Sequence, residues 1–300
     1  MQTACALQFK PVTVADYGKI LPYLSGKHTV ICDLSMLYFH MWGNMLGIEY
    51  AFANEVLFLR RNNKYGLSYY PPLVKDQPLT AGLAYLSYLA LPEVRLCSVP
   101  AHEVEGFERV CAVKEKGTSR RWADYVYNAS DLATLGGKRY HKKRNLVHQF
   151  EKLYPSHTYE TITAENLAEV ITFMQRFAEE AAENEDKAYE NSRVLALLKE
   201  YVDLPVVGGL VRVEGEIVAF TVAEVIDEVL LVHVEKADRR FKGAYQYINS
   251  RFVGEQIKDH AVRFVNREDD AGDEGLRQAK LSYFPVEILH KYHMVIDSKE

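Results

Sequence analysis

The first candidate for chemistry is a basic loop that precedes a helix in the second half of the sequence. The loop and the start of the helix hold Arg240, Lys242, Gly243, Ala244 and Tyr245. The first backbone amides of a helix have no acceptor inside the helix and therefore attract anions. We predict that this loop binds the phosphates of a donor. A basic surface loop with a glycine in its turn is the competing interpretation.

An imidazole and a carboxylate lie just before this loop. His233 and Glu235 are two residues apart in the segment 227–237, whose β-branched residues predict a strand. Side chains two apart in a strand share a face. Glu235, together with His233, is therefore a candidate general base for an amine or hydroxyl that must lose a proton. A solvent-facing or ion-paired Glu235 is the alternative.

A third polar group follows the next predicted strand, 262–268. It consists of Asn266, Arg267, Glu268 and Asp269, with Lys280 in the helix that comes next. Ligands of open α/β sheets usually lie at strand ends. The acidic side chains predict a site for a cationic part of a substrate, and helix capping with a solvated turn would explain the same residues.

The fourth candidate is a basic helix between the two halves of the chain. Five of the eight residues 137–144 are Lys or Arg. Lys138, Lys142, Lys143 and Arg144 would attract phosphate-rich partners such as coenzyme A, tRNA or anionic lipid head groups. A solvated helix face is the ordinary interpretation of such a run.

A weak internal repeat indicates which elements position these groups. Residues 9–24 and 159–174 both run from an aromatic residue through Thr into an amphipathic helix. Residues 48–60 and 209–222 then both predict a β-hairpin. We therefore expect two similar α/β domains, at 1–155 and 156–300; chance similarity of two amphipathic helices is the alternative. The first has no matching Arg-x-x-Gly loop and is expected to be degenerate.

The overall composition is that of a globular protein. The 300 residues are 48% hydrophobic, with a net charge of −5, which is not the bulk composition of a nucleic-acid-binding protein. No apolar run approaches the roughly 20 residues that cross a bilayer, and the first residues lack a signal-peptide pattern. We expect a cytoplasmic protein without a membrane segment. The spacing of the cysteines predicts reduced thiols and no metal site; they are Cys5, Cys32, Cys97 and Cys111.

Three resemblances follow from these motifs. The basic loop is similar to the pyrophosphate signature of the GNAT acyltransferases, Arg/Gln-x-x-Gly-x-Gly/Ala; Arg240 and Gly243 match, and Tyr245 departs from it. Residues 10–292 resemble the phosphatidylglycerol lysyltransferase C-terminal-domain family, in its soluble branch. The segments that carry this resemblance include YNASDLATLGGKRYHKKRNLVHQFEK, VHVEKADRRFKGAYQYINSRF and VNREDDAGDEGLRQAKLSYFPVEILHKY. The basic helix also resembles the linker of Fem-like aminoacyl transferases.

The resemblance implies an α/β fold of two tandem GNAT-like domains, each a mixed, mostly antiparallel sheet flanked by helices. It also implies transfer of an acyl or aminoacyl group from acyl-CoA or aminoacyl-tRNA to an amine or hydroxyl of an acceptor, with no covalently bound cofactor. Arg240, Lys242 and Gly243 would then hold donor phosphates, and Glu235 would serve as the base. The rival hypothesis is a non-catalytic protein that binds an anionic ligand or a partner protein.

Overall fold

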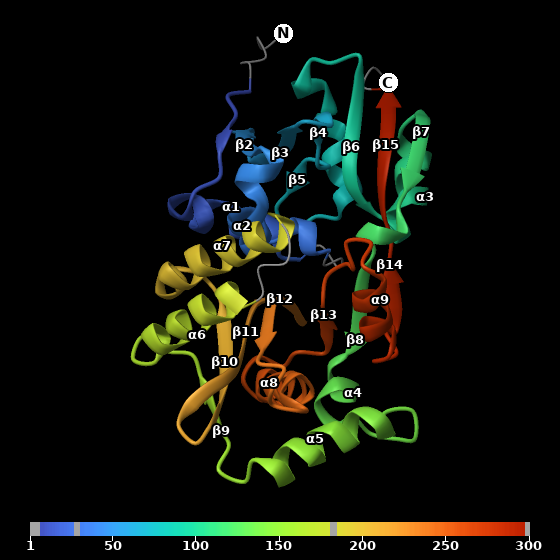
Figure 1. Cartoon of the computed structure of the whole chain (residues 1–300). Coiled ribbons are helices and arrows are strands. Elements are labelled where there is room, and N and C mark those ends of the chain that lie inside the picture. Colours follow the sequence, from blue (N-terminus) through green and yellow to red (C-terminus); the bar gives the residue numbers. More distant parts are fainter. Residues whose placement is uncertain (1–6, 27–30, 181–184, 298–300) are drawn as a thin grey trace. The chain divides into compact units, whose positions relative to one another are not determined.

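The computed structural model of the chain describes residues 7–26, 31–180 and 185–297. These residues form two compact units. Figure 1 shows the chain coloured from the N-terminus to the C-terminus. The first unit comprises residues 1–124, 269–274 and 288–300, and the second comprises 125–268 and 275–287. Each unit is built on one sheet.

The first unit contains an eight-stranded sheet in the order β1-β2-β3-β4-β6-β15-β7, with β5 paired to β3. The strands are β1 (Lys10–Pro11), β2 (Ile48–Ala53), β3 (Val56–Asn63), β4 (Gly66–Tyr69), β5 (Leu73–Val74), β6 (Glu93–Pro100), β7 (Val113–Thr118) and β15 (Lys291–Asp297). The helices are α1 (Tyr17–Leu24), α2 (Met36–Leu46) and α3 (Val104–Val110), with 3-10 turns η1 (Val14–Asp16), η2 (Cys32–Leu34), η3 (Leu79–Leu89), η4 (Ala101–Glu103) and η5 (Arg120–Trp122).

The second unit contains a seven-stranded sheet in the order β14-β8-β13-β12-β11-β10-β9. Its strands are β8 (Asp124–Asn128), β9 (Thr158–Thr161), β10 (Val207–Val213), β11 (Glu216–Ile226), β12 (Val229–Ala237), β13 (Phe264–Asn266) and β14 (Glu287–Leu289). The helices are α4 (Ala129–Thr134), α5 (His141–Leu153), α6 (Leu167–Glu180), α7 (Glu185–Lys199), α8 (Ala244–His260) and α9 (Glu274–Leu281), with the 3-10 turn η6 (Tyr201–Asp203).

The two sheets have the same connectivity, which confirms the repeat read from the sequence. Strands β1 to β4 of the first sheet take the places of β9 to β12 in the second. In each sheet the next pair of strands is parallel, β4 with β6 and β12 with β13. The next position is filled out of chain order, by β15 in the first sheet and by β8 in the second. The fold is thus a tandem repeat of one mixed α/β design.

Strand β8, from the first half of the chain, pairs in the second sheet, and β15, from the end of the chain, pairs in the first. This exchange of β8 and β15 explains why the units differ from the predicted halves 1–155 and 156–300. Residues 125–155 belong to the second unit, because β8 pairs with β13 and α5 packs on α8. Residues 288–300 return to the first unit, because β15 pairs with both β6 and β7. No short-range pattern in the sequence indicates that a strand crosses in this way.

Helix α8 anchors the core of the second unit. It packs against β10, β11 and β12, and α4 and α5 pack on it in turn. Phe252 and Ile248 of α8 are fully buried in this core. Helix α6 contacts β11 separately, where the rings of Phe173 and Phe220 lie 5.8 Å apart. The apolar stripe predicted for α6 is therefore the face that meets the sheet.

Candidate functional site

The candidate site lies where the parallel strands β12 and β13 diverge. They pair through only three positions, Val229 with Phe264, Leu230 with Val265 and Leu231 with Asn266. Beyond these pairs β12 continues to Ala237 with β11 on its other edge, whereas β13 ends. Several of the residues selected from the sequence gather at this divergence, as strand ends in α/β sheets favour.

Glu235 and Arg267 form the centre of this group. Arg267 Nη2 donates to Glu235 Oε1 over 2.8 Å, and the two side chains are 14% and 11% exposed. Asn249 of α8 donates to the other oxygen, Oε2, over 3.0 Å. Burial would lower the pKa of Arg267, but the Glu235 carboxylate holds this pKa above its usual value. The pair is therefore a charged, largely desolvated pair with fixed geometry.

Two buried polar atoms of this group have no hydrogen-bond partner. They are Asn249 Oδ1, an acceptor, and Arg267 Nη1, a donor. Asn249 itself is 1% exposed. Buried polar atoms in native proteins nearly always have partners, so these two atoms are exceptions within the group. An acceptor and a donor next to one carboxylate can together bind a group that has both an N–H and a carbonyl oxygen.

Tyr283 and two lysines adjoin this centre. Lys143 Nζ of α5 lies 4.2 Å from the centroid of the Tyr283 ring, and the Arg267 guanidinium lies 5.0 Å from it. Burial and the charge of Arg267 lower the pKa of Lys143, and burial raises the pKa of Tyr283 to about 12. Lys280 Nζ donates to the backbone oxygen of Arg267 over 2.5 Å. Lys280 thus supports the backbone that carries Arg267.

His233 is held as a cation between two glutamates. Its Nδ1 lies 2.7 Å from Glu268 Oε1 and its Nε2 lies 3.2 Å from Glu224 Oε2, with its side chain fully buried. Burial would lower the pKa of His233, but the two carboxylates raise it to about 9. A protonated imidazole has no free lone pair, so these surroundings favour a structural role over the predicted part in a base. His233 is also the residue of β12 that is skipped where the register with β11 shifts between Val222 and Ala223, and such a bulge re-aims the side chains around it.

The predicted phosphate loop has a structural reason for its glycine. Gly243 is the N-cap of α8 with φ 90°, and a Cβ there would lie 2.3 Å from the backbone oxygen of Leu146 in α5. Arg240 is exposed and pairs with Asp238 at 2.6 Å. Lys242 is exposed, Ala244 is buried and Tyr245 is partly buried. The close approach to α5 accounts for Gly243 without a ligand, and binding of phosphates here remains a prediction.

The other selected residues are more scattered. Lys138 and Lys142 are exposed, and Arg144 Nη1 donates to the backbone oxygen of Gly137 over 3.1 Å, so of the four basic residues Lys143 alone adjoins Tyr283. Asn266 is buried and its Oδ1 accepts from the Glu268 amide over 2.8 Å. Asp269 is counted with the first unit. Asn266, Glu268 and Lys280 therefore support the site, while Lys138, Lys142 and Arg144 point to solvent or backbone.

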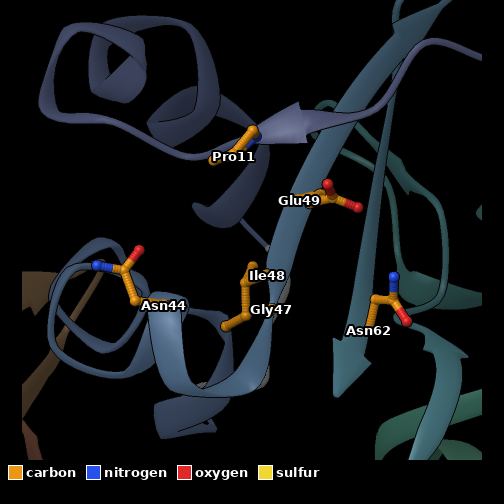
Figure 2. Close-up of a pocket in the computed structure, with 7 residues that line it drawn as sticks. Pro11, Asn44, Gly47, Ile48, Glu49 and Asn62 are labelled. Atoms are coloured by element: carbon orange, nitrogen blue, oxygen red, sulfur yellow. The ribbon is translucent and has the colours of Figure 1, made fainter.

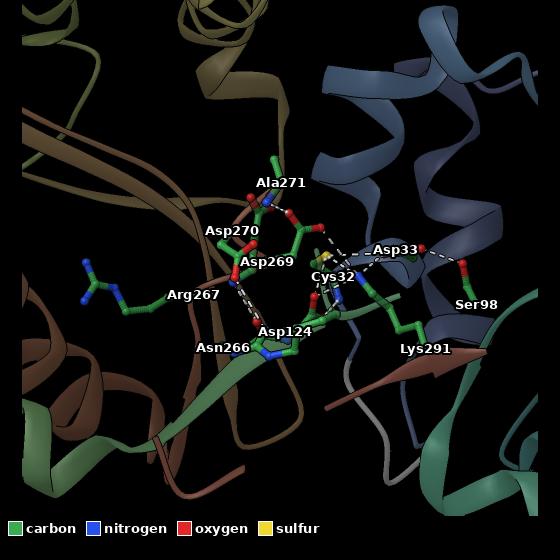
Figure 3. Close-up of polar contacts among 12 residues, drawn as sticks. Cys32, Asp33, Ser98, Asp124, Asn266, Arg267, Asp269, Asp270, Ala271 and Lys291 are labelled. Carbon is green, nitrogen blue, oxygen red and sulfur yellow. Dashed lines mark hydrogen bonds and ion pairs between the residues drawn. The ribbon is translucent and has the colours of Figure 1, made fainter. Parts of the chain in front are cut away.

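Sequence reasoning missed a buried ionic cluster in the first unit, which Figure 3 shows. Lys291 Nζ lies 2.6 Å from Asp33 Oδ1 and 2.7 Å from Asp124 Oδ1, and Cys32 Sγ accepts from it over 3.3 Å. Asp33 also pairs with Arg61 at 2.6 Å. The members are far apart in the sequence and share no motif spacing. Asn249, Tyr283 and Glu224 were missed in the second unit for the same reason.

A cation already occupies the place in this cluster that most resembles a metal site. Cys32, Asp124 and Asp269 offer ligand atoms within 4.8 Å of one another. The Lys291 ammonium contacts Cys32 and Asp124 and lies 3.9 Å from Asp269 Oδ2. The lysine therefore supplies the positive charge that a metal would bring.

A small cavity in the first unit is a separate feature, and Figure 2 shows its lining. Its volume is about 180 Å³, and it is lined by Pro11, Gly43, Asn44, Gly47, Ile48, Glu49 and Asn62. Its one carboxylate, Glu49, accepts from Arg60 Nε over 2.7 Å. None of the residues selected from the sequence lines this cavity. In the part of the chain that the structure describes, no helix is long and apolar enough to span a membrane.

Comparison with solved structures confirms the fold class. A protein of unknown function from Bacteroides thetaiotaomicron is 32% identical, with a TM-score of 0.87 over 97% of this chain and 100% of that one. L-PGS from Bacillus licheniformis is 14% identical, with a TM-score of 0.57 over 87% of each chain. FemX is 9% identical, with a TM-score of 0.59 over 95% of this chain and 96% of that one. At such identities the last two show a shared fold alone.

The sequence comparisons establish the family. An uncharacterised protein from Mycoplasmoides gallisepticum is 26% identical over 174 residues, which cover 56% of this chain and 54% of that protein. The match thus spans about half the length of that relative. The model of the phosphatidylglycerol lysyltransferase C-terminal family matches residues 27–295. Together with the tandem α/β fold, this match shows that the chain belongs to the phosphatidylglycerol lysyltransferase C-terminal family.

Proposed function

We propose that this protein is an aminoacyltransferase whose reaction centre is the divergence of β12 and β13. The observation that carries the proposal is the partly buried Glu235–Arg267 pair with Asn249, next to the buried atoms Asn249 Oδ1 and Arg267 Nη1. The family name adds that its members include enzymes that move a lysyl group. An aminoacyl donor has the two groups that these atoms would bind, an amine and a carbonyl oxygen.

Each residue has a role in this proposal. The donor's amino group would donate to Asn249 Oδ1, and its ester carbonyl oxygen would accept from Arg267 Nη1. A fixed guanidinium in a desolvated site stabilises the oxyanion that forms when the acceptor attacks the carbonyl. The bonds from Arg267 and Asn249 leave lone pairs on Glu235 free, so this carboxylate can take the proton of the attacking hydroxyl or amine. The leaving hydroxyl of the donor then receives that proton.

The donor and acceptor follow from chemistry and family together. We propose aminoacyl-tRNA as the donor, because the acetyl group of acetyl-coenzyme A carries no amine next to its carbonyl for Asn249 Oδ1. Exposed Lys138 and Lys142 would attract its phosphates. We propose phosphatidylglycerol as the acceptor, because its glycerol head group offers a free hydroxyl and the family name contains it. Acyl transfer from coenzyme A at the same centre is the alternative donor chemistry.

The experiment is a transfer assay with two matched variants. tRNA that carries radiolabelled lysine is incubated with phosphatidylglycerol vesicles and the protein, and label in the lipid is counted. Glu235→Gln should lower the rate by about 100-fold or more, because the base is lost while the shape is kept. Glu228→Gln is the control, since Glu228 pairs with Arg263 at 2.8 Å on an exposed part of the same unit.

The outcomes separate the proposal from its rival. Equal rates for the wild type and Glu235→Gln would overturn the role of Glu235. The ion-paired state of Glu235 favours the non-catalytic hypothesis as a second candidate. That hypothesis predicts no transfer by the wild type, yet a rise in melting temperature when charged tRNA is added.

A further inference from the structure

Cys32 and Lys291 lie side by side in the first unit, although 259 positions separate them in the chain. Cys32 lies in η2, and Lys291 begins β15. The Lys291 Nζ and Cys32 Sγ atoms are 3.3 Å apart, and the two residues are 7% and 1% exposed. An amine nitrogen and a sulfur in contact need only a small movement to become bonded.

Two carboxylates hold this pair in place. Lys291 Nζ lies 2.6 Å from Asp33 Oδ1 and 2.7 Å from Asp124 Oδ1. The thiol lies 3.3 Å from the same two oxygens, and the Cys32 backbone amide donates to Asp124 Oδ2 over 2.8 Å. Figure 3 shows the four side chains converging. Reacting groups held at contact distance react as if each were at a very high local concentration.

We propose that Cys32 and Lys291 are a modification site, at which a peroxide converts the pair into a covalent sulfur–nitrogen crosslink. In the first step the sulfur attacks one peroxide oxygen, the O–O bond breaks, and a sulfenic acid and one water form. The sulfur gives up two electrons to the peroxide. This step consumes the only oxidant that the reaction needs.

The second step joins the two side chains. The lysine nitrogen attacks the sulfur of the sulfenic acid, the S–N bond forms, the S–O bond breaks, and the oxygen leaves as water. Asp33 and Asp124 hold the nitrogen through their hydrogen bonds from Lys291; one ammonium proton goes to the departing oxygen and completes the water, and a second leaves to solvent. In sum, a thiol, an ammonium group and a peroxide give the S–N bond, two waters and one proton.

The other described cysteines provide internal controls. Cys97 has the guanidinium of Arg61 nearby, which is a cation but not a nucleophilic amine. Cys111 is partly exposed, and burial raises its pKa. Among the described residues, neither thiol has a hydrogen bond to a lysine. Oxidation should therefore give these two cysteines sulfur–oxygen products without a lysine link.

The experiment is peptide mapping of the full chain after exposure to hydrogen peroxide under native conditions. We expect a peptide with Cys32 joined to a peptide with Lys291, lighter than their sum by two hydrogens and separated again by a thiol reductant. A Cys97→Ser, Cys111→Ser variant should give the same crosslink. Lys291→Arg keeps a cation between Asp33 and Asp124 but removes the amine, so it should give none.

The mass of the product decides the result. Cys32 recovered as a free thiol, or only as sulfinic or sulfonic acid, in the folded wild type would overturn the proposal. A joined peptide that contains one extra oxygen would overturn the S–N step. The wild-type map needs no variant, so a Lys291→Arg protein that fails to fold leaves the test intact.

Discussion

At the scale of single residues, the surroundings of a side chain decide its chemistry more than its type does. Glu235 and His233 share a strand and are two residues apart, yet they have different partners. Glu235 meets Arg267 and Asn249, whereas His233 meets Glu224 and Glu268. The sequence identified both residues but could not show these partners, since all four lie outside β12.

The charged state of His233 gives a prediction about pH and stability. Its pKa is raised from 6.5 to about 9, so the folded state binds the proton more tightly than the unfolded state does. The contribution of protonated His233 to the free energy of unfolding is fully present below about pH 6.5 and is lost as the pH rises through 9. A shift of this size corresponds to at most about 3 kcal/mol. Urea unfolding between pH 6 and 10 should show this loss.

Two variants make the pH test specific. His233→Gln should flatten this part of the pH profile, because the group that titrates is gone. His260→Gln is the matched control, since His260 is exposed at the end of α8 and should leave the profile unchanged. A His233→Gln profile that keeps the full wild-type slope would contradict the assignment.

At the scale of elements, α8 shows how far local patterns reach. The sequence predicted a helix directly after the basic loop, and the structure has α8 there, at Ala244–His260. The glycine before it was explained by phosphate binding, whereas the structure shows α5 packed against it. The sequence motif shows that a glycine stands at this position. Only the tertiary structure shows which neighbour makes the glycine necessary.

A comparison of two glycines distinguishes the cost of backbone strain from the cost of steric contact. Gly243 and Gly215 have φ of 90° and 88°, but a Cβ at Gly243 would lie 2.3 Å from Leu146 oxygen, whereas at Gly215 it would meet nothing within 4 Å. Gly215→Ala should cost about 1 kcal/mol from the left-handed backbone alone. Gly243→Ala should cost about 3 kcal/mol, because the α5–α8 contact must also open. Equal losses in urea unfolding would refute this explanation.

At the scale of the whole molecule, the sequence predicted a duplicated α/β fold, and the sheets confirm it. The repeat was visible because each copy begins with the same run into a helix and a hairpin. The pairing of β8 in the second sheet and of β15 in the first was not visible, because pairing between strands so far apart in the sequence leaves no local signal. The cluster of Asp33, Asp124 and Lys291 depends on that exchange, since Lys291 begins β15.

The exchanged strand predicts the effect of a truncation. A chain that ends at His290 lacks β15, which lies between β6 and β7. The first sheet would then lose its β6–β15–β7 edge, and Asp33 and Asp124 would lose their buried cation. The two tryptophans, Trp42 and Trp122, both belong to the first unit. Tryptophan fluorescence of the truncated chain should therefore match that of the wild type in denaturant; native-like fluorescence would contradict the role of β15.

We propose that the second unit binds an aminoacyl donor through its amine and carbonyl. The most direct measurement is the melting temperature of the wild type with lysyl-tRNA, uncharged tRNA, acetyl-coenzyme A and coenzyme A, without acceptor. A ligand at 100 times its dissociation constant stabilises a protein by about 2.7 kcal/mol. We predict a larger rise with lysyl-tRNA than with uncharged tRNA. Equal rises with both tRNAs, or a rise with acetyl-coenzyme A alone, would contradict the claim.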